Sequence, residues 1–244
     1  MTIAEVQAPR EPKYYTVKRH LLERIATLPA GSVVPTEREL ASELSTSRTT
    51  VRQALVELVA EGRLVRRQGA GTFIADPKIT WPLHLTSFTE QAEANGFVAS
   101  TTLLAAERVR AEGEVAARLD LAEGAGVFRI ERLRLADDRP MAVETSHLSA
   151  ARFPQLTRHI RRQQSLYTVL RETYGVVPVR AEELIATAPA SPREATLLGT
   201  DPGSPMLVLG RHSRAASGEP VEWVTSWYRG DRVTFIADLS APRP

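Results

Sequence analysis

The chain has 244 residues, of which 43% are hydrophobic and 25% are charged, and its net charge is +2. These proportions are typical of a globular protein with one large or two modest domains, and they give no argument for a polycation. No apolar run approaches the ~20 residues of a membrane span, and the N-terminal residues lack the apolar core of a signal peptide. The absence of cysteine excludes disulfides, thiolate metal sites and cysteine nucleophiles. We therefore expect a cytoplasmic protein with no membrane partner.

Positive charge is slightly concentrated near the N-terminus. Residues 1–78 contain 12 Lys and Arg against 9 Asp and Glu, a net charge of +3, whereas the remainder contains 19 against 20, a net charge of −1. This is the sign expected for a chain whose N-terminal part binds DNA, but the difference is too small to identify one by itself.

The first residues predict a disordered start followed by a helix. Residues 1–12 are short, polar and contain two prolines, so we expect them to be disordered. From Lys13 to Leu28, apolar residues recur at spacings of three and four, which predicts an amphipathic helix. Pro29 and Gly31 end it. We expect this helix to support a helix-turn-helix that follows it.

The segment from Pro35 to Gly62 predicts two short helices joined by a tight turn. Thr36 is followed three residues later by Glu39, which is the signature of a capping box. Ser47 can cap the second helix through its hydroxyl group. Gly62 fits the position that directly follows a helix.

The second of these helices has an apolar face and a polar face. The apolar face consists of Val51, Ala54, Leu55 and Leu58, and the polar face of Arg48, Thr49, Arg52 and Gln53. Such a polar face suits a DNA major groove, because Arg pairs with guanine, Gln pairs with adenine, and Thr contacts phosphate or a thymine methyl group. The alternative is an ordinary amphipathic helix with a solvated polar face.

The next segment favours DNA binding. Residues 63–75 read as two short strands around a glycine-containing turn. Two helices followed by a basic hairpin is the order of a winged helix-turn-helix. The hairpin would carry Arg66, Arg67 and Gln68 towards phosphates or a minor groove.

The runs PTERELA, SRTTVRQAL and EGRLVRRQGAGTFIA closely resemble the DNA-binding domain of the GntR family of bacterial regulators. The resemblance implies a repressor that binds double-stranded operator DNA at a palindromic site as a homodimer. We expect the C-terminal domain to form the dimer. The DNA-contacting residues that follow from the pattern and the resemblance are Arg38, Ser47, Arg48, Thr49, Thr50, Arg52, Gln53, Arg66, Gln68, Gly69 and Gly71.

The rest of the chain reads as an α+β domain with an internal repeat. Residues 77–82 contain two prolines, so we interpret them as a linker between a winged helix-turn-helix at 13–76 and an effector domain at 83–244. Shifted by 80 positions, residues 114–149 align without gaps on residues 194–229. Each copy reads as a short helix and two strands, which predicts an antiparallel sheet with helices on one side. The expected strands are 127–136, 141–149, 206–215 and 220–229. The cleft between the two halves is a plausible ligand site.

Two arginines stand out on the first strand of the repeat. Arg132 and Arg134 are two residues apart, so both point to one otherwise apolar face, where they need a counter-charge. A phosphate group on a ligand would provide one. The alternative is internal pairing with Glu144 or Glu222, each on a second strand. In a ligand site these carboxylates would accept hydrogen bonds from sugar hydroxyls or an amide.

Two expected helix starts carry hydroxyl groups. One lies at Thr86, Ser87 and Thr89, and the other at Ser165 and Tyr167. Helix N-termini attract anions, so the two starts could complete a phosphate cradle. No nucleophile–base arrangement emerges, and the five histidines show no metal-ligand spacing. We therefore predict no enzymatic activity, no cofactor and no metal.

The runs LTSFTEQ, RIERLRLADDRPMAVETSHL, QSLYTVL and PVEWVTSWYRGDR resemble the UTRA effector domain, with a chorismate-lyase-like fold, of the HutC branch of GntR regulators. From about residue 13 to residue 239 the chain is similar to N-acetylglucosamine-responsive repressors of the DasR and NagR type. The resemblance implies a repressor of amino-sugar uptake and catabolism, controlled by N-acetylglucosamine 6-phosphate or glucosamine 6-phosphate. The residues it implies are Ser87, Phe88, Thr89, Arg132, Ser165 and Tyr167 for the phosphate and Arg134, Glu144, Glu222 and Tyr228 for the sugar.

Two other functions stay open from the sequence. The first is a regulator of the same branch that responds to another small anion, such as a phosphonate or an organic acid. The second is a sugar-phosphate enzyme, because the effector fold resembles that of a lyase. The DNA-binding segment and the lack of an acid–base arrangement argue against the enzyme.

Overall fold

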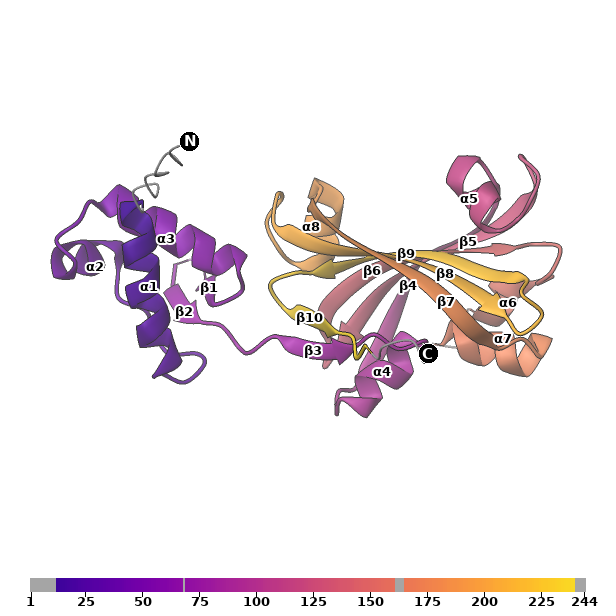
Figure 1. The fold of residues 1–244 in the computed structure, drawn as a ribbon, viewed down its shortest axis with the longest axis horizontal. Helices are drawn as coiled ribbons and strands as arrows, with labels where there is room; N and C mark the ends of the chain where they lie inside the picture. The colour runs from indigo at the N-terminus through magenta and orange to yellow at the C-terminus, as the bar shows by residue number, and fades with distance from the viewer. Residues whose placement is uncertain (1–11, 68, 161–164, 240–244) are drawn as a thin grey trace, which may run out of the picture. The chain divides into compact units, whose positions relative to one another are not determined.

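The computed structural model describes residues 12–67, 69–160 and 165–239. The disorder expected for residues 1–12 therefore falls outside the described residues except for Pro12, and Gln68 also lies outside them. The chain divides into two compact units, Met1–Lys78 and Ile79–Pro244 (Figure 1). Within the described ranges, no helix is long and apolar enough to cross a membrane.

The first unit is a winged helix-turn-helix, as the sequence predicted. Its elements in chain order are α1 (Lys13–Ala26), α2 (Glu37–Glu43), α3 (Arg48–Ala60), β1 (Leu64–Arg67) and β2 (Gly71–Ile74). The capping box of Thr36 and Glu39 is formed, and the Ser47 hydroxyl accepts a hydrogen bond from the Thr50 amide. The apolar face of α3 is buried against α1 and α2, which leaves its polar face exposed.

The second unit is built on a six-stranded antiparallel sheet with the order β4-β5-β6-β9-β8-β7. Its strands are β4 (Ala99–Arg110), β5 (Gly126–Ala136), β6 (Arg139–Ser149), β7 (Pro178–Pro189), β8 (Pro205–Ala215) and β9 (Pro220–Arg229). Its helices are α4 (Phe88–Ala94), α5 (Gly113–Arg118), α6 (Leu156–Ile160), α7 (Leu166–Tyr174) and α8 (Pro192–Leu198).

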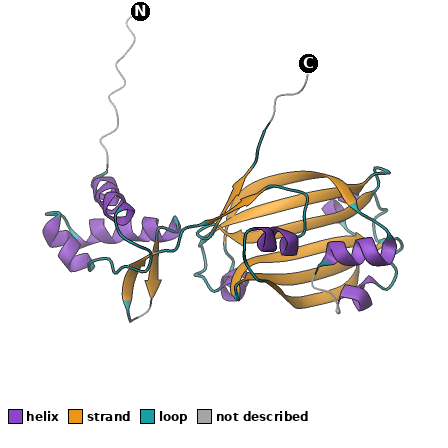
Figure 2. Ribbon diagram, turned by 90° about the horizontal axis from the view of Figure 1, so that it is seen from below, coloured by secondary structure: helices purple, strands orange, loops and turns teal. Residues whose placement is uncertain are grey.

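Helices cover both faces of this sheet, so the expectation of helices on one side was wrong. In Figure 1, α4, α6 and α7 lie on one side of the sheet and α5 and α8 on the other, and Figure 2 shows the sheet from the side of α4 and α7. The reason is that the central strands are apolar on both faces. Phe128 packs towards α6 and α7, whereas the adjacent Val127 packs towards α5.

The internal repeat is larger than the sequence suggested. The order α4-β4-α5-β5-β6 recurs as α7-β7-α8-β8-β9. At the centre of the sheet Thr145 pairs with Thr225, and these residues are 80 positions apart, so a local two-fold axis passes between β6 and β9. The edge strands β4 and β7 escaped prediction because they are rich in Ala and Glu, which are uncommon in strands.

The predicted linker at 77–82 is corrected by the structure. Its last four residues form β3 (Ile79–Pro82), which pairs in parallel with β10 (Val233–Ile236). Trp81 is 0% exposed, and its ring lies 5.2 Å from that of Phe88 and 5.9 Å from that of Tyr228. The partner strand lies about 150 residues further along the chain, so no local pattern could reveal the pairing.

If Trp81 is a core residue rather than a linker residue, Trp81→Ala should lower the free energy of unfolding of the second unit by ~3–5 kcal/mol, because it leaves a large cavity. Urea unfolding of the full chain measures this. Ile236→Ala on the partner strand is the control, because Ile236 is largely exposed and should cost less than about 0.5 kcal/mol. Equal and small decreases in the free energy of unfolding for both variants would show that Trp81 is a linker residue.

Candidate functional site

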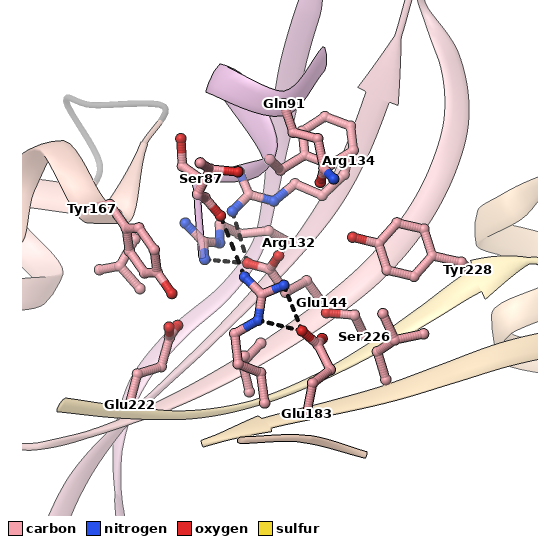
Figure 3. Close-up of a pocket in the computed structure, with 16 residues that line it drawn as sticks. Ser87, Gln91, Arg132, Arg134, Glu144, Tyr167, Glu183, Glu222, Ser226 and Tyr228 are labelled. Atoms are coloured by element: carbon pink, nitrogen blue, oxygen red, sulfur yellow. Dashed lines mark hydrogen bonds and ion pairs between the residues drawn. The ribbon is translucent and has the colours of Figure 1, made fainter. Parts of the chain in front are cut away.

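A polar hollow lies between two apolar clusters on the α4 and α7 face of the sheet. One cluster gathers around α6 and α7 and the other around α4 and Trp81. The hollow between them encloses about 500 Å³ of space, part of which is open to solvent. Figure 3 shows its lining, in which the charged side chains come from β5, β6, β7, β8 and β9 and uncharged ones from α4 and α7.

Strand register brings the charged side chains of the hollow to one face. Arg132 on β5 pairs with Glu144 on β6, which in turn pairs with Ser226 on β9. On the other half of the sheet Glu183 on β7 pairs with Arg211 on β8. Directly opposed residues share a face, so the two halves of the repeat contribute to one site.

Glu144 is the counter-ion of both strand arginines. Its Oε1 atom accepts hydrogen bonds from Nη2 of Arg132 and, at 2.7 Å, from Nη2 of Arg134. Arg132 also donates to the Ser146 hydroxyl at 3.2 Å, and Arg134 to the Thr101 hydroxyl at 2.9 Å. The internal pairing that the sequence left open as an alternative is therefore present.

That pairing is incomplete at Arg132. The residue is 2% exposed, and its Nε and Nη1 atoms are buried with no hydrogen-bond partner in the part of the chain that the structure describes. Burial, and then the charge of Arg134, lower the pKa of Arg132 to about 10. A buried guanidinium with unused donors is costly, and further hydrogen-bond acceptors near Arg132 would reduce that cost.

The two central glutamates differ in their ionisation. Burial opposes the charge of Glu144, but Arg132 and Arg134 together outweigh it and lower the pKa of Glu144 to about 2. Burial, and then the negative charge of Glu144, raise the pKa of Glu222. The side chains of Glu222 and Tyr167 point towards each other (Figure 3). The site therefore holds one firmly ionised carboxylate and one that is destabilised in its charged form.

Arg211 is a third arginine of the hollow, and the sequence reasoning missed it. Its Nε donates to Glu183 at 2.9 Å, and its Nη1 donates to the Thr86 carbonyl at 3.3 Å. It thus connects the edge strand β7 to the loop before α4. Burial lowers the pKa of Arg211, but the charge and hydrogen bond of Glu183 together with the neighbouring Tyr167 and Tyr228 outweigh this effect, and the net shift of the pKa is upward.

The alignment of the two repeats does not reveal Arg211, because the register between β8 and β9 differs by one residue from the register between β5 and β6. The 80-residue shift carries the pair Arg132 and Glu144 onto residues 212 and 224, yet Val224 pairs with Arg211. A one-residue slip moves a side chain to the other face of a sheet. The shared face of Leu209, Arg211 and Ser213, two residues apart along β8, was the sequence signal that could have identified it.

Of the ten predicted effector residues, the hollow is lined by Ser87, Phe88, Arg132, Arg134, Glu144, Tyr167, Glu222 and Tyr228. Thr89 and Ser165 are not in the lining. Thr89 follows Phe88 on α4 and so points to a different side of that helix, and the Ser165 hydroxyl accepts a hydrogen bond from the Thr168 amide. Gln91 and Ser226 line the hollow and were not predicted.

The helix starts are less available to an anion than the sequence suggested. The amide and the hydroxyl of Ser87 both donate to the carboxylate of Glu90, each at 2.9 Å, in a capping box. The arginines are therefore the principal cations and donors of the hollow, with the Ser87 hydroxyl at its edge.

The predicted DNA-contacting residues lie on α2, α3 and the β1–β2 hairpin. The exposed ones are Arg38, Ser47, Arg48, Thr49, Arg52, Gln53, Arg66, Gly69 and Gly71, and Thr50 is half-buried. Ser47 and Thr50 also share a hydrogen bond of 2.7 Å at the start of α3. Gly69 and Gly71 have φ of 74° and 115°, conformations that favour glycine.

The profile of the UTRA domain matches residues 94–234, and that of bacterial regulatory proteins of the gntR family matches residues 13–74. The HTH-type transcriptional repressor PhnF of Mycolicibacterium smegmatis is 38% identical, covering 96% of this chain and 95% of its own. The HTH-type transcriptional repressor NagR of Bacillus subtilis is 37% identical, covering 92% of this chain and 93% of its own.

A solved structure agrees with the fold. The crystal structure of PhnF from Mycobacterium smegmatis has a TM-score of 0.64 and 37% identity, covering 93% of this chain and 100% of that one. Both sequence relatives are named as transcriptional repressors, which supports regulation rather than catalysis.

The raised pKa of Glu222 gives a pH-dependent test of the site. Above the pKa of the folded state the buried charge destabilises the empty protein, and this penalty is lost as the pH falls through that pKa. Glu222→Gln should therefore raise the stability of the ligand-free chain at pH 8, by on the order of 1–3 kcal/mol, and less at pH 5. Thermal unfolding at both pH values measures this.

The control is Glu107→Gln, which neutralises a largely exposed glutamate on β4. It should give no pH-dependent gain. A gain for Glu222→Gln that is the same at pH 5 and pH 8 would show that Glu222 is not the strained carboxylate of the site.

Proposed function

Because this chain belongs to the GntR family of bacterial regulatory proteins and is a transcriptional repressor of the HutC type, we propose that a small phosphorylated amino sugar controls its operator binding. The effector is N-acetylglucosamine 6-phosphate or glucosamine 6-phosphate, and it binds in the hollow between α4 and α7. The genes controlled are those of amino-sugar uptake and catabolism. The similarity to NagR supports this choice of ligand class.

The observation that carries the anion half of this proposal is the incomplete pairing of Arg132. Arg132, whose buried Nε and Nη1 atoms have no hydrogen-bond partner among the described residues, lines the hollow together with Arg134 and Arg211. A phosphate offers three acceptor oxygens, and hydrogen bonds between guanidinium and phosphate are among the stronger ones in proteins. A phosphate in contact with Arg132 would satisfy donors that the protein leaves unused.

The sugar half of the proposal rests on polar side chains that β9 contributes to the hollow. Glu222 and Tyr228, both on β9, line it together with Ser226. Sugar hydroxyls and an amine or amide group are hydrogen-bond donors that suit the carboxylate of Glu222. A ligand without them would bring no donor to this buried carboxylate, whose charge burial already disfavours, and would bind less tightly.

A second candidate is a different small anion, such as a phosphonate or an organic acid. PhnF and NagR are almost equally similar to this chain, so similarity alone does not choose between their ligands. The arginines would also accept any tetrahedral anion. The sugar-facing acceptors are what favour an amino-sugar phosphate.

We also propose that the protein acts in the cytoplasm as a homodimer on a palindromic operator. One helix-turn-helix reads few base pairs, and two related by a two-fold axis read two half-sites at a fixed spacing. In this proposal α3 enters the major groove and the β1–β2 hairpin contacts the backbone or the minor groove.

Calorimetric titration of the full chain tests the effector. N-acetylglucosamine 6-phosphate or glucosamine 6-phosphate should bind, and unphosphorylated N-acetylglucosamine should bind far more weakly. Arg132→Ala should lower the affinity at least tenfold, because hydrogen bonds to charged groups contribute about 1.5–3 kcal/mol each. Thermal unfolding checks that the variant is folded.

Arg129→Ala is the matched control, because Arg129 lies on the same strand but points to the opposite face, where it pairs with Glu107 at 2.9 Å. It should leave the affinity within about twofold. Failure of both sugar phosphates to bind, together with binding of a phosphonate or an organic acid, would replace the amino sugar by the second candidate.

A further inference from the structure

A carboxylate lies within the predicted DNA-reading surface of the first unit. Glu37 is the first residue of α2 and accepts hydrogen bonds from two arginines on other elements. Arg52 on α3 donates from Nε at 3.1 Å and from Nη2 at 2.9 Å, both to Oε2. Arg66 on β1 donates from Nη2 at 3.3 Å to Oε1. Glu37 therefore connects α2, the predicted DNA-reading helix α3 and the β1–β2 hairpin, which is the wing.

This contact is firmly ionic. The side chain of Glu37 is 19% exposed, whereas those of Arg52 and Arg66 are more than half exposed. The hydrogen bond from Arg52 lowers the pKa of Glu37, with the charges of Arg66 and Arg48 adding to the effect. Glu37 is therefore a fixed negative charge at neutral pH.

A negative charge at this place opposes affinity for DNA in general. Binding to phosphates grows with the number of cations that neutralise them and carries no sequence information. Glu37 reduces the charge that Arg52 and Arg66 present to phosphates. Its benefit must lie in something other than the strength of binding.

Geometry points to orientation of Arg52. An exposed arginine side chain has ~2 kcal/mol of rotamer entropy, and a free guanidinium can reach many phosphate oxygens. Glu37 holds the Nε side of the Arg52 guanidinium. The hydrogens of Nη1 and the second hydrogen of Nη2 stay available, and this pair forms the fork that matches O6 and N7 of guanine.

We propose that Glu37 is a specificity-determining positioning residue. It holds Arg52 for base reading and restrains Arg66, so it weakens binding to unrelated DNA more than binding to the operator. The same position in the first turn of α2 also suits an acidic side chain for helix stability. A purely structural role would lower stability but would leave base preference unchanged.

The test compares two DNA duplexes and one charge-neutral variant. Wild-type protein first selects its preferred site from a random-sequence duplex pool. Fluorescence anisotropy then gives Kd for the selected duplex and for a scrambled duplex of the same composition. Glu37→Gln should bind the scrambled duplex several-fold more tightly and the selected duplex no more tightly. The ratio of the two affinities should fall about tenfold, as expected for loss of one base contact.

Glu43→Gln is the matched control. Glu43 lies on the same helix and pairs with Arg24 of α1 at 3.2 Å, away from α3 and the wing. It changes the net charge equally, so it should strengthen binding to both duplexes alike and keep their ratio. If Glu37→Gln changes Kd for both duplexes by the same factor, Glu37 acts only through its charge, and the proposal is overturned.

Two further measurements separate positioning from folding. In an Arg52→Ala background, Glu37→Gln should no longer lower the affinity ratio, because the residue it positions is absent. Site selection with Glu37→Gln and with Arg52→Ala at low temperature should lose base preference at the same position of the site. Retained preference at that position in Glu37→Gln would also overturn the proposal, even if the variant is less stable.

Discussion

The second unit depends on the buried contact between Glu144 and the guanidinium groups of Arg132 and Arg134. Two cations on the inner face of a sheet would be prohibitive without a counter-ion, since burying a charge costs several kcal/mol even after relaxation. Glu144 pairs with both arginines and so lowers the cost of burying them, but its single negative charge does not neutralise two positive charges. Among the described residues, Arg132 keeps donors without a partner, and burial together with Glu144 destabilises the charge of Glu222. A ligand with an anion at one end and hydrogen-bond donors at the other would relieve both.

Packed aromatic rings also connect the hollow to β3, at the start of the second unit. Phe88 and Tyr228 line the hollow, and both rings pack on Trp81 of β3. β3 begins directly after Lys78, the last residue of the first unit. We therefore expect movement of either ring on ligand binding to act on the strand that leads to the DNA-binding unit.

The sequence predicted those features that are encoded locally. The caps at Thr36 and Ser47 fixed the starts of α2 and α3, and the two-residue spacing of Arg132 and Arg134 placed both on the buried face. Features that depend on distant segments were missed. The pairing of β3 with β10 joins the two ends of the second unit, and the edge strands are held by their neighbours rather than by their own composition. Arg211 escaped because the two repeats differ in register by one residue, which no alignment of the repeats can show.

The sequence also did not predict the hydrogen-bond partners of individual site residues. Arg52 was expected to face DNA freely, but a carboxylate fifteen positions earlier holds it. Ser87 was expected to offer its amide to an anion, but Glu90 already accepts that hydrogen bond. In both cases a side chain assigned to a ligand has a partner within the protein, and the geometry of the folded chain decides which hydrogen atoms stay free.

We propose that effector binding and operator binding are coupled through one protein. Coupling between two sites is reciprocal, so operator DNA must weaken effector binding by the same factor by which the effector weakens DNA binding. The most direct measurement is calorimetric titration of N-acetylglucosamine 6-phosphate into the full chain, alone and saturated with its selected duplex. We expect a weaker effector affinity in the presence of DNA, by the factor found when the effector displaces DNA. Equal effector affinities with and without DNA would contradict the coupling.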